Sequence, residues 1–143
     1  PVILLEEDMY KSILVAVALD HGDAAKALLD RAKQLAEPGG TIRAVNVVDP
    51  IPAYVTAEIP PDLFMNQSGR AEKDMQDLLV GYESVVPEIR VGGAAAEIMA
   101  AAEEHGSDLI MIASHKPGFS TYFIGSTAAR VVRHAQCSVL VSR

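Results

Sequence analysis

The chain has 143 residues and a formal charge of −7, from 12 basic and 19 acidic side chains. This length fits one domain, the acidic balance disfavours nucleic acid as a partner, and no run approaches the roughly 20 apolar residues of a membrane helix. With no signal segment in sight either, we expect a cytoplasmic protein. The single cysteine, Cys137, excludes disulfides and thiolate zinc sites within one chain, and we expect it to be packed and unreactive.

The N-terminal half predicts two strands around an amphipathic helix. Residues 1–8 precede a sharper pattern and are expected to be an extension to a domain of residues 9–143. The apolar run 12–17 predicts a buried strand, and Asp20 and Asp23 are expected to cap the helix that follows. The inner face of that helix is predicted to carry Ala24, Ala27, Leu28, Arg31, Ala32 and Leu35. Pro38-Gly39-Gly40 should end it, before a second strand at 41–48.

The C-terminal half continues the alternation of strands and helices. Four prolines predict an extended loop at 49–61. A charged helix is expected at 62–82, with its inner side at Leu63, Met75, Leu78 and Leu79. The remaining predictions are a strand at 88–91, a helix at 94–105 capped by Gly106, a strand at 109–113, a helix at 126–134 and a strand at 138–141.

Strictly alternating strands and helices, with strands apolar on both faces, predict a doubly wound parallel α/β sheet. In such Rossmann-like sheets, ligands bind beyond the carboxyl ends of the strands, where the winding direction reverses. We therefore look for function after the first, second and fourth strands. If the strand order is 3-2-1-4-5, the strand at 138–141 lies at an edge and invites pairing with a second copy.

The chain lacks the sequence motifs of the reactions that are common in such folds. The chain has no GxGxxG turn, no GxxxxGK[ST] loop and no GxSxG elbow, and its four histidines have no metal-ligand spacing. What remains is the loop after residue 113, which ends in Gly125-Ser126 at a predicted helix start. The first amides of a helix lack internal partners, so this position can hold phosphate oxygens, although Gly-Ser pairs are often only a turn and an N-cap.

In these features the chain resembles the universal stress proteins. The resemblance covers residues 9–143 and rests on MYKSILVAV, NVVDP, Gly92, AEIMAAAEEHGSDLIMIASH and GSTAARVVRHAQCSVLVSR. The run SHKPGFSTYFIGS is most similar to a shorter-loop branch found among enteric bacterial members. Many members bind ATP through Gly, two residues, Gly, nine residues, Gly and then Ser or Thr.

The resemblance implies an adenine nucleotide site in which part of that pattern is altered. The two early glycines correspond to Ala113 and Lys116, while Gly125 and Ser126 keep the end of the pattern. Ala18 stands where ATP-binding members tend to have an aspartate. The implied nucleotide-binding residues are Val17, Ala18, Val47, Ala113, Ser114, His115, Lys116, Gly125, Ser126 and Thr127.

Several of these side chains also have simpler interpretations. His115 is expected to contact ligand without transferring a proton, since no carboxylate orients it. Lys116 is either a phosphate contact or an ordinary solvated lysine. Asp20 and Asp23 are more consistent with helix caps than with ribose or magnesium ligands, and Asp49 has the same ambiguity.

The resemblance implies a stress-response regulator that binds ATP or a related adenine nucleotide, with or without Mg²⁺, and dimerises through its last strand. We find no set of base, nucleophile and orienting residue, so we expect at most slow ATP hydrolysis or self-phosphorylation. The alternative is a nucleotide-free dimerising interaction module, because two glycines and the aspartate of the binding pattern are replaced.

Overall fold

The computed structural model describes residues 9–50, 61–114 and 124–143, and within them five strands form one sheet of order β3-β2-β1-β4-β5. The strands are β1 (Tyr10–Ala16), β2 (Ala36–Val48), β3 (Val85–Val91), β4 (Leu109–Ala113) and β5 (Ser138–Ser142). The helices are α1 (Gly22–Leu35), α3 (Pro61–Leu78), α4 (Ala94–Glu104) and α5 (Ser126–His134). Each neighbouring pair of strands is parallel, so the predicted doubly wound α/β class and strand order are confirmed.

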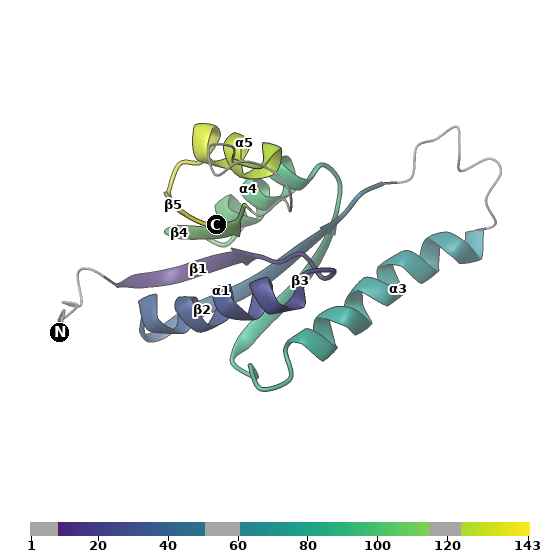
Figure 1. Cartoon of the computed structure of the whole chain (residues 1–143), viewed down its shortest axis with the longest axis horizontal. Helices are drawn as coiled ribbons and strands as arrows, with labels where there is room; N and C mark the ends of the chain where they lie inside the picture. Colours follow the sequence, from purple (N-terminus) through teal and green to yellow (C-terminus); the bar gives the residue numbers. More distant parts are fainter. Residues whose placement is uncertain (1–8, 51–60, 115–123) are drawn as a thin grey trace.

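Helices cover both faces of the sheet, with α1 and α3 on one side and α4 and α5 on the other (Figure 1). Successive side chains of a strand point to opposite faces, so β1 contributes to two cores. Ile13 and Val15 pack with α1, whereas Leu14 packs with α4 and α5, and all three are almost fully buried. Burying each such side chain contributes about 1.5–3 kcal/mol, which fixes the central strand and the position of its carboxyl end.

The inner face of α1 matches the predicted one only in part, at Leu28 and Ala32. The buried residues are Ala25, Leu28, Leu29 and Ala32, whereas Arg31 and Ala27, which were expected to face inward, are exposed. The observed stripe is wholly apolar, and so avoids burying the guanidinium of Arg31. The expected caps are also wrong, since the N-cap is His21 and no side chain caps the helix. Asp23 instead lies in the first turn, where its charge favours the helix dipole.

Pro38-Gly39-Gly40 lies within β2 and does not end α1, which stops at Leu35. The pairing of β1 with β2 is irregular at this point, because Tyr10 pairs with Ala36 while Ser12 already pairs with Thr41. Gly39 has φ +81°, a conformation that glycine adopts without strain. The three residues therefore accommodate an irregularity in the strand.

Two other boundaries differ from the sequence predictions. β3 begins at Val85 and contains Pro87, which an edge strand tolerates because one side of its backbone is unpaired. α3 ends at Leu78, with Met75 and Leu78 buried as expected, while the side chain of Leu63 lies outside the described residues. No helix in the described part of the chain is long and apolar enough to cross a membrane.

The predicted cap at Gly106 is confirmed in detail. Gly106 has φ +61°, and its N–H donates to the carbonyl of Glu103 at 3.3 Å. The N–H of Ser107 donates to the carbonyl of Ala102 at 2.8 Å. Together these bonds form the Schellman pattern that satisfies the last carbonyls of α4.

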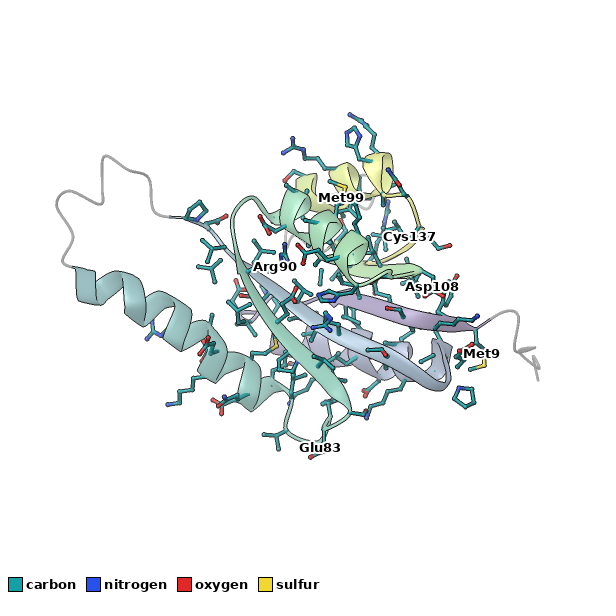
Figure 2. All side chains as sticks on the ribbon, turned by 180° about the vertical axis from the view of Figure 1, so that it is seen from behind. Met9, Glu83, Arg90, Met99, Asp108 and Cys137 are labelled. Atoms are coloured by element: carbon teal, nitrogen blue, oxygen red, sulfur yellow. The ribbon has the colours of Figure 1, made fainter. Side chains whose placement is uncertain are left out.

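A charged cluster joins β2 and β3 to α4, with Arg90 at its centre (Figure 2). The Arg90 guanidinium donates to Glu97 at 2.8 Å, to Glu104 at 2.9 Å and to Glu88 at 3.2 Å. Glu88 also lies 2.9 Å from His105, and 3.5 Å from the Arg43 guanidinium on β2. The cluster therefore ties the β3 edge of the sheet to the helix above it.

This cluster shifts the pKa values of Glu88, Arg90 and Glu104. Burial raises the pKa of the Glu88 carboxyl, but the hydrogen bonds from His105 and Arg90 outweigh it and leave that pKa below its usual range. The hydrogen bond from Arg90 lowers the pKa of Glu104, and the bonds to Glu104 and Glu97 raise the pKa of Arg90. Glu88, Glu104 and Arg90 are therefore charged at neutral pH.

Candidate functional site

A cavity of about 340 Å³ opens at the carboxyl ends of β1, β2 and β4, bounded by α4 and α5. This volume falls within the range of small-molecule sites, roughly 300–1,000 Å³. The structure brings five of the predicted site residues together here: Val17, Ala18, Val47, Ala113 and Thr127. The other lining residues are Ala16, Leu19, Asp20, Val45, Asn46, Ala94, Ile98 and Ile112.

The inner wall of the cavity is apolar and deeply buried. Val17, Val45, Ile98 and Ile112 are all nearly inaccessible to solvent, with exposed fractions of 5%, 1%, 4% and 5%. The N–H of Val17 donates to the carbonyl of Val45 at 2.9 Å, which extends the β1–β2 pairing to the edge of the cavity. Such a wall suits a flat, apolar group such as an aromatic base.

Asn46 also lines the cavity, and sequence reasoning missed it. Its side-chain Nδ2 donates to the backbone carbonyl of Val17 at 2.9 Å. The bond satisfies a carbonyl at the point where β1 ends and its loop begins. The available signal was a lone asparagine inside the apolar strand TIRAVNVV. Ala94 and Ile98 were missed too, because they come from a helix far away in the sequence.

Ser114 and Gly125 hold the two ends of the β4–α5 connection together. The N–H of Gly125 donates to Ser114 Oγ at 2.6 Å, and the N–H of Ser114 donates to the carbonyl of Ser142 at 2.7 Å. A hydroxyl that accepts one bond keeps its own proton free to donate. Ser114 can therefore present an O–H to a ligand while it fixes the start of α5.

Gly125 is the N-cap of α5, with Ser126 exposed and Thr127 half-buried in the first turn. No side chain caps this helix, and its first turn carries no acidic residue. The first amides of a helix have no partner within the helix, and they carry the positive end of its dipole. The start of α5 is therefore open to an anionic group next to the apolar wall.

The β1–α1 loop forms the outer rim of the cavity. Asp20 lies 3.6 Å from His21, and their side chains are 81% and 54% exposed. A second hollow of about 440 Å³ extends from this rim toward α1, and it shares Ala16, Ala18, Asp20 and Ala113 with the first. The two hollows therefore meet at the carboxyl end of β1.

The predicted contacts His115 and Lys116 lie outside the described residues. In the parts of the chain that the structure describes, no group of three or more His, Cys, Asp or Glu side chains is placed to hold a metal ion. Cys137 lies at the far end of the sheet from the cavity, beside Asp108 (Figure 2), and is half-buried. Burial and the charge of Asp108 raise the pKa of its thiol, which agrees with the expectation of low reactivity.

Comparisons with known proteins point to one family. A family model described as the universal stress protein family matches residues 9–143. Universal stress protein G of Shigella flexneri is 28% identical over 142 residues, which cover 94% of this chain and 100% of that protein. Among solved structures, hypothetical protein MJ0577 has a TM-score of 0.77 at 25% identity, covering 94% of this chain and 96% of that one.

A second solved structure is a universal stress protein in complex with cAMP. Its TM-score is 0.60 at 20% identity, and the match covers 94% of this chain and 98% of that one. At this identity the likeness shows the fold alone.

Proposed function

The chain belongs to the universal stress protein family, and from this premise we propose that it binds ATP or a related adenine nucleotide in a stress-response regulatory role, as a cytoplasmic homodimer. In this proposal the base lies against Val47 and the apolar wall of the cavity. The phosphates reach the first turn of α5, where Gly125, Ser126 and Thr127 offer amide and hydroxyl donors.

The observation that carries the proposal is the convergence of four separate chain segments on one cavity. Val17 and Ala18 follow β1, Val47 lies on β2, Ala113 ends β4 and Thr127 begins α5. They surround an apolar wall next to an uncapped helix start, which is the combination that a nucleoside phosphate needs. A protein of the same fold in complex with cAMP supports the idea that such a site accommodates an adenine nucleotide.

Mg²⁺ would enter with a triphosphate. Asp20 is the carboxylate among the described residues that line the cavity, and its side chain is largely exposed at the rim. An exposed carboxylate suits a magnesium ion that keeps most of its waters and its phosphate ligands. In our proposal Asp20 therefore contacts the hydrated ion, and the phosphates hold it.

The homodimer would form through β5, which lies at the edge of the sheet. The outer backbone groups of an edge strand can pair with a second copy of the same strand. The apolar side chains Val139, Leu140 and Val141 are only partly buried in the single chain. Pairing would cover them further.

A nucleotide-free dimerising module is the second candidate, and one observation favours it. Ser114 Oγ already accepts the N–H of Gly125, so one of the donors expected for phosphate has an internal partner. The family's ATP pattern has an aspartate where this chain has Ala18 and a glycine where it has Lys116. Both replacements also favour the nucleotide-free module.

The first experiment is to denature freshly purified protein and identify any released small molecule by mass spectrometry. Calorimetric titration of the ligand-free protein with Mg·ATP follows. An adenine nucleotide in the supernatant, or micromolar binding, supports the proposed site. If neither is found, the proposal fails and the dimerising module stands.

Substitution of Gly125 provides a matched pair of variants. A Cβ at this position would lie 3.5 Å from Ser114 Oγ, an ordinary contact, so Gly125→Ala should fold normally. Gly125→Leu places a larger side chain over the helix start and should weaken Mg·ATP binding at least about tenfold, or 1.4 kcal/mol. Titration calorimetry of both variants checks this, with thermal denaturation as the control for folding. Equal binding by wild type and Gly125→Leu would contradict a phosphate site at α5.

A further inference from the structure

Another cavity, of about 350 Å³, lies at the amino ends of β4 and β5, and it shares no described lining residue with the proposed nucleotide site. The walls of this amino-end cavity come from the C-terminal half of α4, the start of β4 and the segment that joins α5 to β5. Met99 and Cys137, two of its lining residues, lie on the α4 and α5 side of the sheet (Figure 2). Its volume falls within the range of small-molecule sites.

The floor of the amino-end cavity is apolar. Ala102 and Ile110 are 7% and 1% exposed, and Met99, Ala135 and Cys137 are half-buried against the same core. All five residues line the cavity. The thioether of Met99 and the thiol of Cys137 are soft and polarizable, and such sulfur atoms contact aromatic rings favourably. The floor therefore suits an apolar body, and an aromatic one in particular.

Two carboxylates make the surroundings of this cavity negative. Glu103 lines it and is exposed, and no cation in the described part of the chain pairs with its side chain. Asp108, beside Cys137, accepts the N–H groups of Lys11 and Ser12 at 2.9 and 3.0 Å, which hold its carboxylate in place. Burial raises the pKa of the Cys137 thiol and the charge of Asp108 raises it further, so the field of Asp108 reaches the cavity wall.

Both neighbouring helices also end at this cavity, α4 at Glu104 and α5 at His134, so the negative ends of two helix dipoles meet there. The last carbonyls of α4 are capped, whereas those of α5 that follow Val131 have no partner within the helix. No lysine or arginine is among the described lining residues, and Arg133 in the last turn of α5 is exposed and lies outside the lining. The potential in the cavity therefore favours a cation.

We propose that the amino-end cavity binds a small organic cation, that is, an ammonium group joined to an aromatic or similar apolar body. The body packs on Met99 and Ile110, and the ammonium group lies between the Glu103 carboxylate and the last carbonyls of α5. The same charges repel an anion, so this cavity excludes a nucleoside phosphate. The inference is therefore independent of the proposed nucleotide site.

The test compares tryptamine with tryptophol, which has the same ring and the same chain but ends in a hydroxyl. Because this chain contains no tryptophan, indole fluorescence reports the bound probe alone. Tryptamine should bind in the millimolar range and about fivefold tighter than tryptophol, the upper end for a pair with an exposed carboxylate. Indole-3-acetate, which carries a negative charge, should bind weakest. High salt should reduce the advantage of tryptamine.

Glu103→Gln removes the carboxylate and keeps the shape of the side chain, so it should bring the affinities for tryptamine and tryptophol within about twofold of each other. Glu104→Gln is the matched control, because it makes the same change of charge on a side chain that Arg90 binds and that does not line the cavity. This control should keep the wild-type ratio. Equal wild-type affinities for the two probes, or an undiminished advantage of tryptamine in Glu103→Gln, would overturn the cationic ligand.

The single cysteine locates the bound probe in the wild-type chain, without any variant. Cys137 lies in the cavity wall, so tryptamine at twice its Kd should slow the reaction of this thiol with a maleimide about threefold by competition. Failure of tryptamine to bind, or binding that leaves Cys137 equally reactive, would overturn the site.

Discussion

Gly92 and Gly93 are adjacent between β3 and α4, yet only one of them needs to be glycine. Gly92 has φ +150°, a conformation that residues with a Cβ rarely adopt. A Cβ there would lie 2.8 Å from Cγ of Glu97, the residue that holds Arg90. Gly93, the N-cap of α4, has φ −72° and open space around it.

We therefore expect Gly92→Ala to destabilise the fold by about 1–3 kcal/mol, because it strains the backbone and displaces Glu97 from Arg90. Gly93→Ala, one residue away, should cost less than about 1 kcal/mol. Urea denaturation of the two variants and wild type measures the difference. Similar stabilities for the two variants would show that the positive φ at Gly92 has no energetic consequence.

For single residues, the sequence predicts a place in the site when that place follows from the direction of a strand. Val17, Val47 and Ala113 end parallel strands or lie near their ends, so they had to meet at one edge of the sheet. Asn46 could not be found this way, because its role depends on a bond to Val17, 29 residues away in sequence. The Ser114–Gly125 bond likewise closes a loop whose ends no spacing rule brings together.

Along strand β5, the backbone N–H and C=O groups of alternate residues point toward β4 or toward the free edge of the sheet. The carbonyl of Ser142 accepts the N–H of Ser114, so the backbone of Ser142 faces the β4 side. The N–H and C=O of one residue point to the same side of a strand and alternate along it. Leu140 therefore also faces β4, while Val139 and Val141 direct their N–H and C=O groups to the open edge.

This alternation allows the proposed dimer to be tested without removing the strand. Val139→Pro deletes an outward N–H and should give a folded monomer, because proline is tolerated where the N–H faces away from the sheet. Leu140→Pro deletes an N–H that pairs with β4 and should reduce stability by about 3 kcal/mol or more. Light scattering after size-exclusion chromatography gives the mass, with 15.2 kDa expected for one chain. A Val139→Pro protein that stays dimeric would count against an interface at β5.

The accuracy of the sequence predictions for whole elements depends on burial. The apolar run of β4 predicted its bounds correctly, because it is covered on both faces. The edge strand β3 was predicted three residues too short, since Pro87 is a poor strand residue that only an edge tolerates. The face of α1 was predicted only in part: Leu28 and Ala32 are buried as expected, but packing on the sheet buries Ala25 and Leu29 and leaves Ala27 and Arg31 exposed.

For the whole molecule, the Arg90 cluster is the main polar link between the sheet and the α4 layer in the described residues. Arg90 and Glu88 come from β3, Arg43 from β2, and Glu97, Glu104 and His105 from α4 or its C-cap. The side chain of Arg90 is only 17% exposed, so solvent screens its bonds less than those of a surface pair. Because the pKa values of Glu88 and Glu104 are lowered, the stability that this cluster contributes depends on pH.

The sign of the pH effect follows from those two carboxyls. Both have a lower pKa in the folded chain than the value of about 4.3 expected when unfolded. Their contribution to stability is therefore present above the unfolded pKa and is lost as pH falls through the folded pKa. Thermal denaturation should show the melting temperature of the wild-type protein falling between about pH 5 and pH 3.

Arg90→Gln should lower stability at pH 7 by about 1–2 kcal/mol, toward the low end for charged hydrogen bonds because Glu104 is half-exposed. It should also flatten part of the decline from pH 5 to pH 3, since Glu104 loses the donor that lowers its pKa and Glu88 keeps only the hydrogen bond to His105. Arg31→Gln, on the exposed face of α1, makes the same change of charge and should leave both quantities near wild type. If Arg90→Gln kept the full acid sensitivity, the groups that titrate between these pH values would have to lie outside the Arg90 cluster.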